Sequence, residues 1–298
     1  MPSRDERETV LTAASETRTV TPPTATLPSG DELPMVGVGT WDIDGDTVQE
    51  SVRAGLDAGY AHVDTAEGYK NEGEIGEALA DYDREDVFLT SKVLPKHLDY
   101  ESVIEACEAS LDRLGTDYLD LYLVHWPNPA TSIRETMNAM ATLHDQGKIR
   151  NVGVSNFSAY QLGAAQHVAD VPIAVNQIEY HPWNTQDQVV EFCRDTDTVV
   201  EAAAPLGRTE VFADDVIQDL AAKYDKSPAQ IILKWAVEND VVVLPKSSSP
   251  EHVRQNFDLF DWDLDTADRE RIDAIEREQA VYDTGINDWD NDTYGISQ

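Results

Sequence analysis

Apolar residues follow two different periods along most of the chain. From residue 36 onward, short runs rich in valine, leucine and isoleucine alternate with longer stretches in which apolar residues recur every three or four positions. Runs of the first kind predict buried β-strands, and stretches of the second kind predict amphipathic helices. The expected strands are Val36–Gly39, Ala61–Asp64, Val87–Lys92, Leu119–Val124, Val152–Val154, Ile173–Gln177, Thr198–Ala202 and Val241–Leu244.

A helical stretch follows each expected strand. Before the first of them, the extended runs Thr24–Leu27 and Glu32–Met35 flank a Pro-Ser-Gly-Asp turn, which predicts a β-hairpin. The expected helices are Asp46–Ala58, Glu72–Ala80, Tyr100–Leu114, Ser132–Gln146, Ala159–Val168, Gln186–Arg194, Asp214–Tyr224 and Pro228–Glu238, with two more that begin at Pro250 and Thr266.

This order of elements favours a single α/β domain, a (β/α)₈ TIM barrel with an N-terminal β-hairpin. A doubly wound open sheet also alternates strand and helix, but it typically carries a Gly-x-Gly-x-x-Gly turn when it binds a dinucleotide, and this sequence has none. Eight repeats of similar length fit the barrel better, and 298 residues are normal for one barrel. We expect the domain to span residues 21–298. Residues 1–20 have mixed charge and no apolar period, which predicts a disordered tail.

The chain is strongly acidic. It contains 57 Asp and Glu against 22 Lys and Arg, a formal net charge of −35, yet 41% of its residues are hydrophobic, too many for a disordered acidic chain. Such a charge repels phosphates, so neither nucleic acid nor an anionic membrane is an expected partner. We interpret the surface as salt-adapted, because molar salt shortens the Debye length to about 3 Å and screens the self-repulsion. An ordinary acidic protein is the alternative.

Cysteine usage and the absence of long apolar runs bear on location. Cys107 and Cys193 form no Cys-x-x-Cys or metal-ligand spacing, which suits a reducing compartment and predicts no metal site. The N-terminus is charged where a signal peptide needs apolar residues, and no eighteen apolar residues run together. We therefore expect a cytoplasmic protein with no membrane partner, and we expect it to be a monomer.

Three successive expected strands end on residues that carry chemistry. Asp64, Lys92 and His125 stand at or directly after these strand ends, and Tyr69 lies on the loop after the first. In a (β/α)₈ barrel the C-terminal strand ends face one mouth, so the four side chains should converge. The Lys92 ammonium would favour the Tyr69 phenolate and make the hydroxyl a better acid, while the carboxylate holds the ammonium in place. His125 would add a donor where a carbonyl oxygen gains charge.

These residues belong to motifs by which the chain resembles the aldo-keto reductase family, over about Leu33 to Phe260. In that family, hydride moves from the nicotinamide C4 to a carbonyl carbon while a tyrosine protonates the oxygen. The resemblance implies that Tyr69 is the acid, that Lys92 and Asp64 tune it, and that His125 orients the carbonyl. The matching motifs are Asp64-Thr65-Ala66-x-x-Tyr69-x-Asn71-Glu72, Thr90-Ser91-Lys92, Leu123-Val124-His125-Trp126-Pro127, Gly153-Val154-Ser155-Asn156-Phe157, Asn176-Gln177-Ile178-Glu179-Tyr180-His181-Pro182 and Leu244-Pro245-Lys246-Ser247.

The resemblance also implies a cofactor, NADP(H), with NAD(H) as a second one. Residues that match those around the nicotinamide carboxamide, then those around the adenosine phosphate and adenine, are Ser155, Asn156 and Gln177, followed by Lys246, Ser247 and Asn256. Leu206 joins this expected set at the start of a loop, Leu206–Phe212, too short for a long flap over the pyrophosphate. Trp41 and Trp126 are expected in the substrate pocket, with Tyr282 and Trp289 as further candidates that ordinary packing would explain equally well.

Two positions depart from the family's pattern. Ala203 stands where the family usually has an aromatic residue on which the nicotinamide stacks, and Ala204 follows it where the family has serine. His252 stands where members that prefer NADPH commonly carry arginine. These departures leave open which residue covers the nicotinamide and how well the two cofactors are distinguished.

The sequence leaves other functions to be weighed against reduction of an aldehyde or ketone, such as a sugar or keto acid. Lys92 or Lys246 could form a Schiff base, as in a class I aldolase, although that chemistry needs a neutral lysine and Lys92 has Asp64 to keep it charged. A metal-dependent hydrolase would want a His-x-His pair, to which His62-x-Asp64 is the nearest approach. A barrel that binds the cofactor without turnover is a third alternative.

Overall fold

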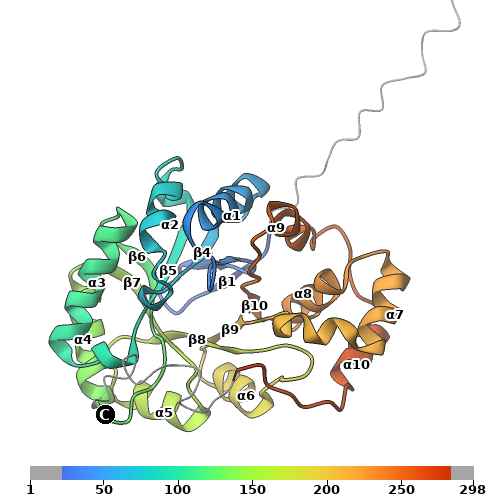
Figure 1. Cartoon of the computed structure of the whole chain (residues 1–298). Coiled ribbons are helices and arrows are strands. Elements are labelled where there is room, and N and C mark those ends of the chain that lie inside the picture. Colours follow the sequence, from blue (N-terminus) through green and yellow to red (C-terminus); the bar gives the residue numbers. More distant parts are fainter. Residues whose placement is uncertain (1–21, 283–298) are drawn as a thin grey trace, which may run out of the picture.

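A computed structural model describes residues 22–282 (Figure 1). The expected tail, residues 1–20, and the candidate Trp289 lie outside this range. The predicted hairpin is confirmed: β1 (Thr24–Thr26) and β2 (Glu32–Pro34) pair antiparallel, with Ala25 opposite Leu33. Within residues 22–282 no helix is both long and apolar enough to cross a membrane.

Eight parallel strands form the second sheet, in the spatial order β10-β9-β8-β7-β6-β5-β4-β3. The two ends of this sheet meet, because parallel bridges join Val36 to Val243 and Gly39 to Lys246. This closure confirms the predicted (β/α)₈ barrel. The strands are β3 (Val38–Gly39), β4 (His62–Asp64), β5 (Phe88–Val93), β6 (Leu119–Val124), β7 (Ile149–Ser155), β8 (Ile173–Glu179), β9 (Val199–Ala203) and β10 (Val242–Val243).

Helices surround the strands on the outside of the barrel (Figure 1). All the predicted helices are present, and their ends differ from the predicted ones by a residue or two, as is usual for helix ends. The α-helices are α1 (Gly45–Ala58), α2 (Glu72–Leu79), α3 (Tyr100–Leu114), α4 (Ile133–Asp145), α5 (Ala159–Val168), α6 (Asp187–Asp195), α7 (Asp215–Tyr224), α8 (Pro228–Glu238), α9 (Pro250–Phe257) and α10 (Thr266–Asp273).

Four short 3₁₀ helices within residues 22–282 were not predicted, because segments of three to seven residues are too short to show an apolar period. They lie in the loops of the barrel, and two of them shape the site described below. These helices are η1 (Glu67–Tyr69), η2 (Arg84–Asp86), η3 (Pro95–His97) and η4 (Gly207–Ala213).

The barrel interior is apolar at one end and polar at the other. At the N-terminal end of the strands, Leu27 and Leu33 of the hairpin pack against Leu121, Val175 and Val242, so the hairpin closes the bottom of the barrel. Further along the same strands the buried side chains become polar. Water is therefore excluded from one end of the barrel, and charged side chains gather at the other.

Candidate active site

The four side chains predicted to carry the chemistry converge as expected. Lys92 Nζ donates to Asp64 Oδ1 at 2.6 Å, to the Thr65 carbonyl at 2.9 Å and to the Tyr69 hydroxyl at 3.1 Å. The ring of His125, which directly follows β6, meets the Tyr69 ring edge-on with centroids 5.5 Å apart. Lys92 is fully buried, and Asp64 and His125 are each only 4% exposed. The sequence therefore placed these residues correctly at neighbouring strand ends.

Buried hydrogen bonds hold the loop that carries Tyr69 to the segment after β3. Asn71 Nδ2 donates to the carbonyls of Thr40 and Ile43 at 2.8 and 2.7 Å, and Thr65 Oγ1 donates to Asn71 Oδ1 at 3.1 Å. Both Asn71 and Thr65 are fully buried. These bonds tie the loop to the chain after β3, and the Tyr69 hydroxyl at the loop is itself held by Lys92 Nζ at 3.1 Å.

Burial adds a contribution to the protonation of the site that the sequence does not show. Beside the expected influence of Lys92, burial, with the Asp64 charge second, raises the pKa of Tyr69 well above its usual value. Burial, with Lys92 second, lowers the pKa of His125 well below its usual value. These shifts favour a protonated Tyr69 and a neutral His125, and in these states both can donate a hydrogen bond to an oxygen between them.

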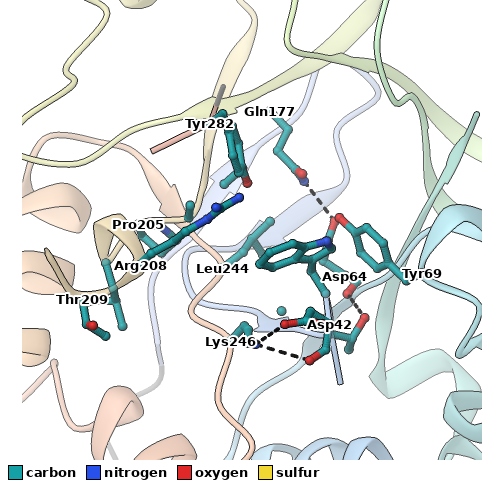
Figure 2. A pocket seen from close by; sticks show the side chains of 16 residues that line it. Asp42, Asp64, Tyr69, Gln177, Pro205, Arg208, Thr209, Leu244, Lys246 and Tyr282 are labelled. Atoms are coloured by element: carbon teal, nitrogen blue, oxygen red, sulfur yellow. Dashed lines mark hydrogen bonds and ion pairs between the residues drawn. The ribbon is translucent and has the colours of Figure 1, made fainter. Parts of the chain in front are cut away.

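A cavity of about 390 Å³ opens beside Tyr69 and Asp64 (Figure 2). Three of the expected cofactor residues, Gln177, Leu206 and Lys246, line it. Trp41, the first expected substrate residue, lines it too. The cavity therefore joins Asp64 and Tyr69 to part of the expected cofactor site, whereas Lys92 and His125 do not line it.

The other expected cofactor residues do not line this cavity. Ser155 and Asn156 lie at the end of β7, where Ser155 Oγ donates to the Gln177 carbonyl at 2.9 Å and Asn156 Nδ2 donates to the His125 carbonyl at 3.0 Å. Both residues are therefore next to the site, at the ends of the strands that carry it.

The expected adenosine-side residues follow β10 around α9. Ser247 accepts a hydrogen bond at its carbonyl from Ser51 Oγ at 2.7 Å, His252 is exposed, and Asn256 is 4% exposed. Only His252 of these three offers its side chain fully to solvent.

Two cations flank the Trp41 ring at the mouth of the cavity. Arg208 Cζ lies 5.1 Å and Lys246 Nζ lies 5.4 Å from the ring centroid. Lys246 Nζ also donates to the Asp42 carbonyl at 3.3 Å and lies 3.5 Å from Asp42 Oδ2. Figure 2 shows Arg208 entering from the side opposite Tyr69. Sequence reasoning missed Arg208 and Asp42, whose roles depend on loop geometry: Arg208 has a left-handed φ of 48° inside η4.

The segment 279–282, which we call the C-terminal strap, reaches the cavity. The backbone N–H groups of Val281 and Tyr282 donate to the two oxygens of Glu179, at 2.7 and 2.8 Å. Glu179 is buried at the end of β8, and His181 Nε2 lies 2.8 Å from one of its oxygens. The Tyr282 ring lines the cavity and meets the ring of Trp126 at 6.4 Å. Tyr282 and Trp126 are thus close together, and Trp126 itself does not line the cavity.

The residues present fit a nicotinamide dinucleotide. Its phosphates need cations, and Lys246 and Arg208 supply them at one end of the cavity. Its carboxamide needs an acceptor, and Gln177, which is 3% exposed and lines the cavity, presents Oε1 there because its side-chain nitrogen is bound to protein. In contrast, within residues 22–282 no three His, Cys, Asp or Glu side chains are grouped so that they could hold a metal ion.

Comparisons with known proteins agree with one another. The sequence matches a family model described as "Aldo/keto reductase family" over residues 35–277. It is 40% identical over 257 residues to an aldo-keto reductase of Mycolicibacterium smegmatis, in an alignment that covers 85% of this chain and 94% of that protein. It is 38% identical over 261 residues to the glyoxal reductase of Bacillus subtilis, in an alignment that covers 87% of this chain and 94% of that protein.

The solved structures that resemble this chain are also aldo-keto reductases. An aldo/keto reductase from Brucella melitensis superposes with a TM-score of 0.81 at 40% identity, covering 85% of this chain and 99% of that one. An aldo-keto reductase from Bombyx mori in complex with NADP superposes with a TM-score of 0.83 at 33% identity, covering 91% and 97%.

Proposed function

Because the chain belongs to the aldo/keto reductase family and is therefore an NAD(P)H-dependent carbonyl reductase, we propose that Tyr69 is the residue that protonates the carbonyl oxygen. The observation that carries this assignment is the contact of its hydroxyl with Lys92 Nζ at 3.1 Å, beside a cavity. A proton donor must reach the reacting oxygen and must hold its proton until needed. The raised pKa of Tyr69 satisfies the second condition.

Each residue of the group has a role in this reaction. When bound, the reduced nicotinamide supplies a hydride to the carbonyl carbon. Neutral His125 and the Tyr69 hydroxyl donate hydrogen bonds to the carbonyl oxygen and orient it. Tyr69 gives up its proton as charge develops on that oxygen, and the Lys92 ammonium stabilises the resulting phenolate. Asp64, at 2.6 Å from Lys92 Nζ, holds the ammonium in position.

The contact between Lys92 and Asp64 argues against an aldolase that forms a Schiff base at Lys92. A Schiff base would require a neutral Lys92, whereas its nitrogen lies 2.6 Å from Asp64 and is fully buried. The family comparisons support neither an aldolase nor a barrel without turnover. Trapping with borohydride in the presence of substrate should leave the protein unmodified.

We propose that the substrates are small aldehydes or ketones, with sugars and keto acids among them. The deciding assay is oxidation of NADPH and NADH at high salt over a panel of aldehydes, aldoses and keto acids. Glyoxal belongs in the panel because the Bacillus subtilis relative is named a glyoxal reductase. Failure of every carbonyl in the panel to support cofactor oxidation would contradict the proposal.

We expect weak discrimination between NADPH and NADH, within about tenfold or ~1.4 kcal/mol. The 2′-phosphate that distinguishes them is best bound by a guanidinium fork, whereas exposed His252 offers one ring N–H and Lys246 is already engaged by Asp42. His252→Arg should shift the ratio of kcat/KM toward NADPH. The measurement is that ratio in both proteins; a wild type that already favours NADPH a thousandfold would show that Lys246 suffices.

We further propose that the protein is a cytoplasmic monomer adapted to high salt. The support is its charge of −35. Screening of that charge should raise the melting temperature steadily between 0.1 and 3 M KCl, because the repulsion acts on the compact state. Thermal melts across that range test the idea. A melting temperature that stays constant or falls would leave an ordinary acidic protein as the better interpretation.

A further inference from the structure

Glu201 is a buried carboxyl group that the proposed mechanism does not use. It lies on β9, is 0% exposed, and stands in register with Gln177 on β8. In the part of the chain that the structure describes, no lysine or arginine forms an ion pair with it; Lys92 contacts Asp64 instead. The Nε2 atom of His62 lies 3.9 Å from Glu201 Oε1. A carboxyl group so placed needs another reason for its burial.

The contacts of Gln177 supply that reason. Its side-chain nitrogen donates to Asp64 Oδ2 at 2.9 Å and to Glu201 Oε2 at 3.0 Å. These two bonds use both amide hydrogens, so the orientation of the amide is fixed with its nitrogen toward the barrel interior. The amide oxygen is left for the cavity that Gln177 lines.

We propose that Glu201 is a positioning residue for the cofactor: by holding the Gln177 nitrogen, it aims the Gln177 oxygen at the carboxamide N–H₂ of the nicotinamide. This inference rests on the proposed function. With Asp64 alone as acceptor, only one amide hydrogen would be bound and the amide plane could swing about that bond, whereas the second bond to Glu201 fixes the plane and with it the direction of the oxygen. Glu201 therefore acts on the cofactor only through Gln177.

Glu201 does this as a neutral acid. Burial, with the Asp64 charge second, raises the pKa of Glu201 to about 8. The titratable and charged groups that face it are Asp64 and His62 from β4 and Lys92 from β5, while the neighbours in register on β8 and β10 are Gln177 and Val242. His62 is uncharged, because burial lowers its pKa to about 3. Below pH 8, the negative charge of Asp64 and the positive charge of Lys92 therefore cancel. Above pH 8, ionisation of Glu201 adds one negative charge to this group of side chains.

The first test measures the dissociation constant of NADPH by quenching of tryptophan fluorescence, with no turnover. Glu201→Leu keeps the volume but removes the acceptor, and it should weaken NADPH binding about tenfold, since one oriented hydrogen bond to the cofactor is lost. Glu201→Gln keeps an acceptor oxygen and should bind within about twofold of wild type. Gln177→Leu should show the same loss as Glu201→Leu, and the double variant no further loss, because both act through one amide.

The second test uses the charge of Glu201. The oxidised ring is positive and the reduced ring is neutral, so ionisation of Glu201 should lower the ratio of the NADP⁺ to the NADPH dissociation constant about tenfold between pH 6.5 and 9.5. The 2′-phosphate is common to both forms and cancels in the ratio. Glu201→Gln should show a constant ratio over the same range. This arm uses an isosteric variant, so it holds even if the leucine variant does not fold.

The outcomes separate this inference from the proposed function. NADPH binding by Glu201→Leu equal to that of wild type would overturn the positioning role. If the ratio of the NADP⁺ to the NADPH dissociation constant showed the same pH dependence in wild type and Glu201→Gln, the claim that Glu201 acts as a neutral acid would be wrong. In both cases wild type would still bind NADPH and reduce carbonyls. If wild type did neither, the proposed function itself would fail.

Discussion

Tyr69→Phe is expected to lose turnover by about 10²–10⁴ while its affinity for NADPH stays close to that of wild type. The substitution removes only the hydroxyl, so the ring keeps its edge-on contact with His125 and the loop keeps its bonds through Asn71. The measurements are kcat and the dissociation constant of NADPH in both proteins. His125→Gln serves as a comparison, because it leaves the acid in place and should cost less. Near-wild-type kcat in the phenylalanine variant would show that another group protonates the carbonyl.

Lys92→Met is expected to lower the free energy of unfolding by about 3–5 kcal/mol as well as abolish most turnover. Lys92 is fully buried and Asp64 is 4% exposed, so removal of the ammonium leaves a buried carboxylate without its counter-ion. Chemical denaturation with wild type alongside measures the loss.

The matched control is the double variant Lys92→Met with Asp64→Asn. It removes both charges, so it should recover most of the stability and none of the turnover. A single variant that unfolds within about 1 kcal/mol of wild type would mean that the pair is solvated or replaceable, and Lys92 would then have a catalytic role without a structural one.

The fold could be predicted from the sequence because each of its parts has a local signal. A buried strand such as Leu119–Val124 is a short run of mostly apolar residues, and a helix such as Tyr100–Leu114 shows its apolar stripe without reference to any neighbour. The convergence of the candidate site could be predicted for a related reason: Asp64, Lys92 and His125 are polar residues at strand ends, and the barrel brings such ends together.

What the sequence could not predict depends on contacts between distant residues. Glu201 looks like a residue on a solvent face within Val-Val-Glu-Ala-Ala, and only the closed barrel shows that it faces inward toward Gln177. The contact of Asp42 with Lys246 joins residues far apart in the chain, across the strands that close the barrel. The raised pKa of Tyr69 could not be predicted either, because burial, its largest cause, has no signature in the sequence.

The attachment of the C-terminal strap has a consequence for how this protein can diverge. Glu179 binds the strap through the backbone N–H groups of Val281 and Tyr282, and every residue except proline offers such a group. Substitutions at position 282 therefore change the wall of the cavity while the anchor that docks it stays intact. We therefore expect that evolution can alter which carbonyl compounds fit the cavity by replacing Tyr282, without loss of the backbone bonds that hold the strap.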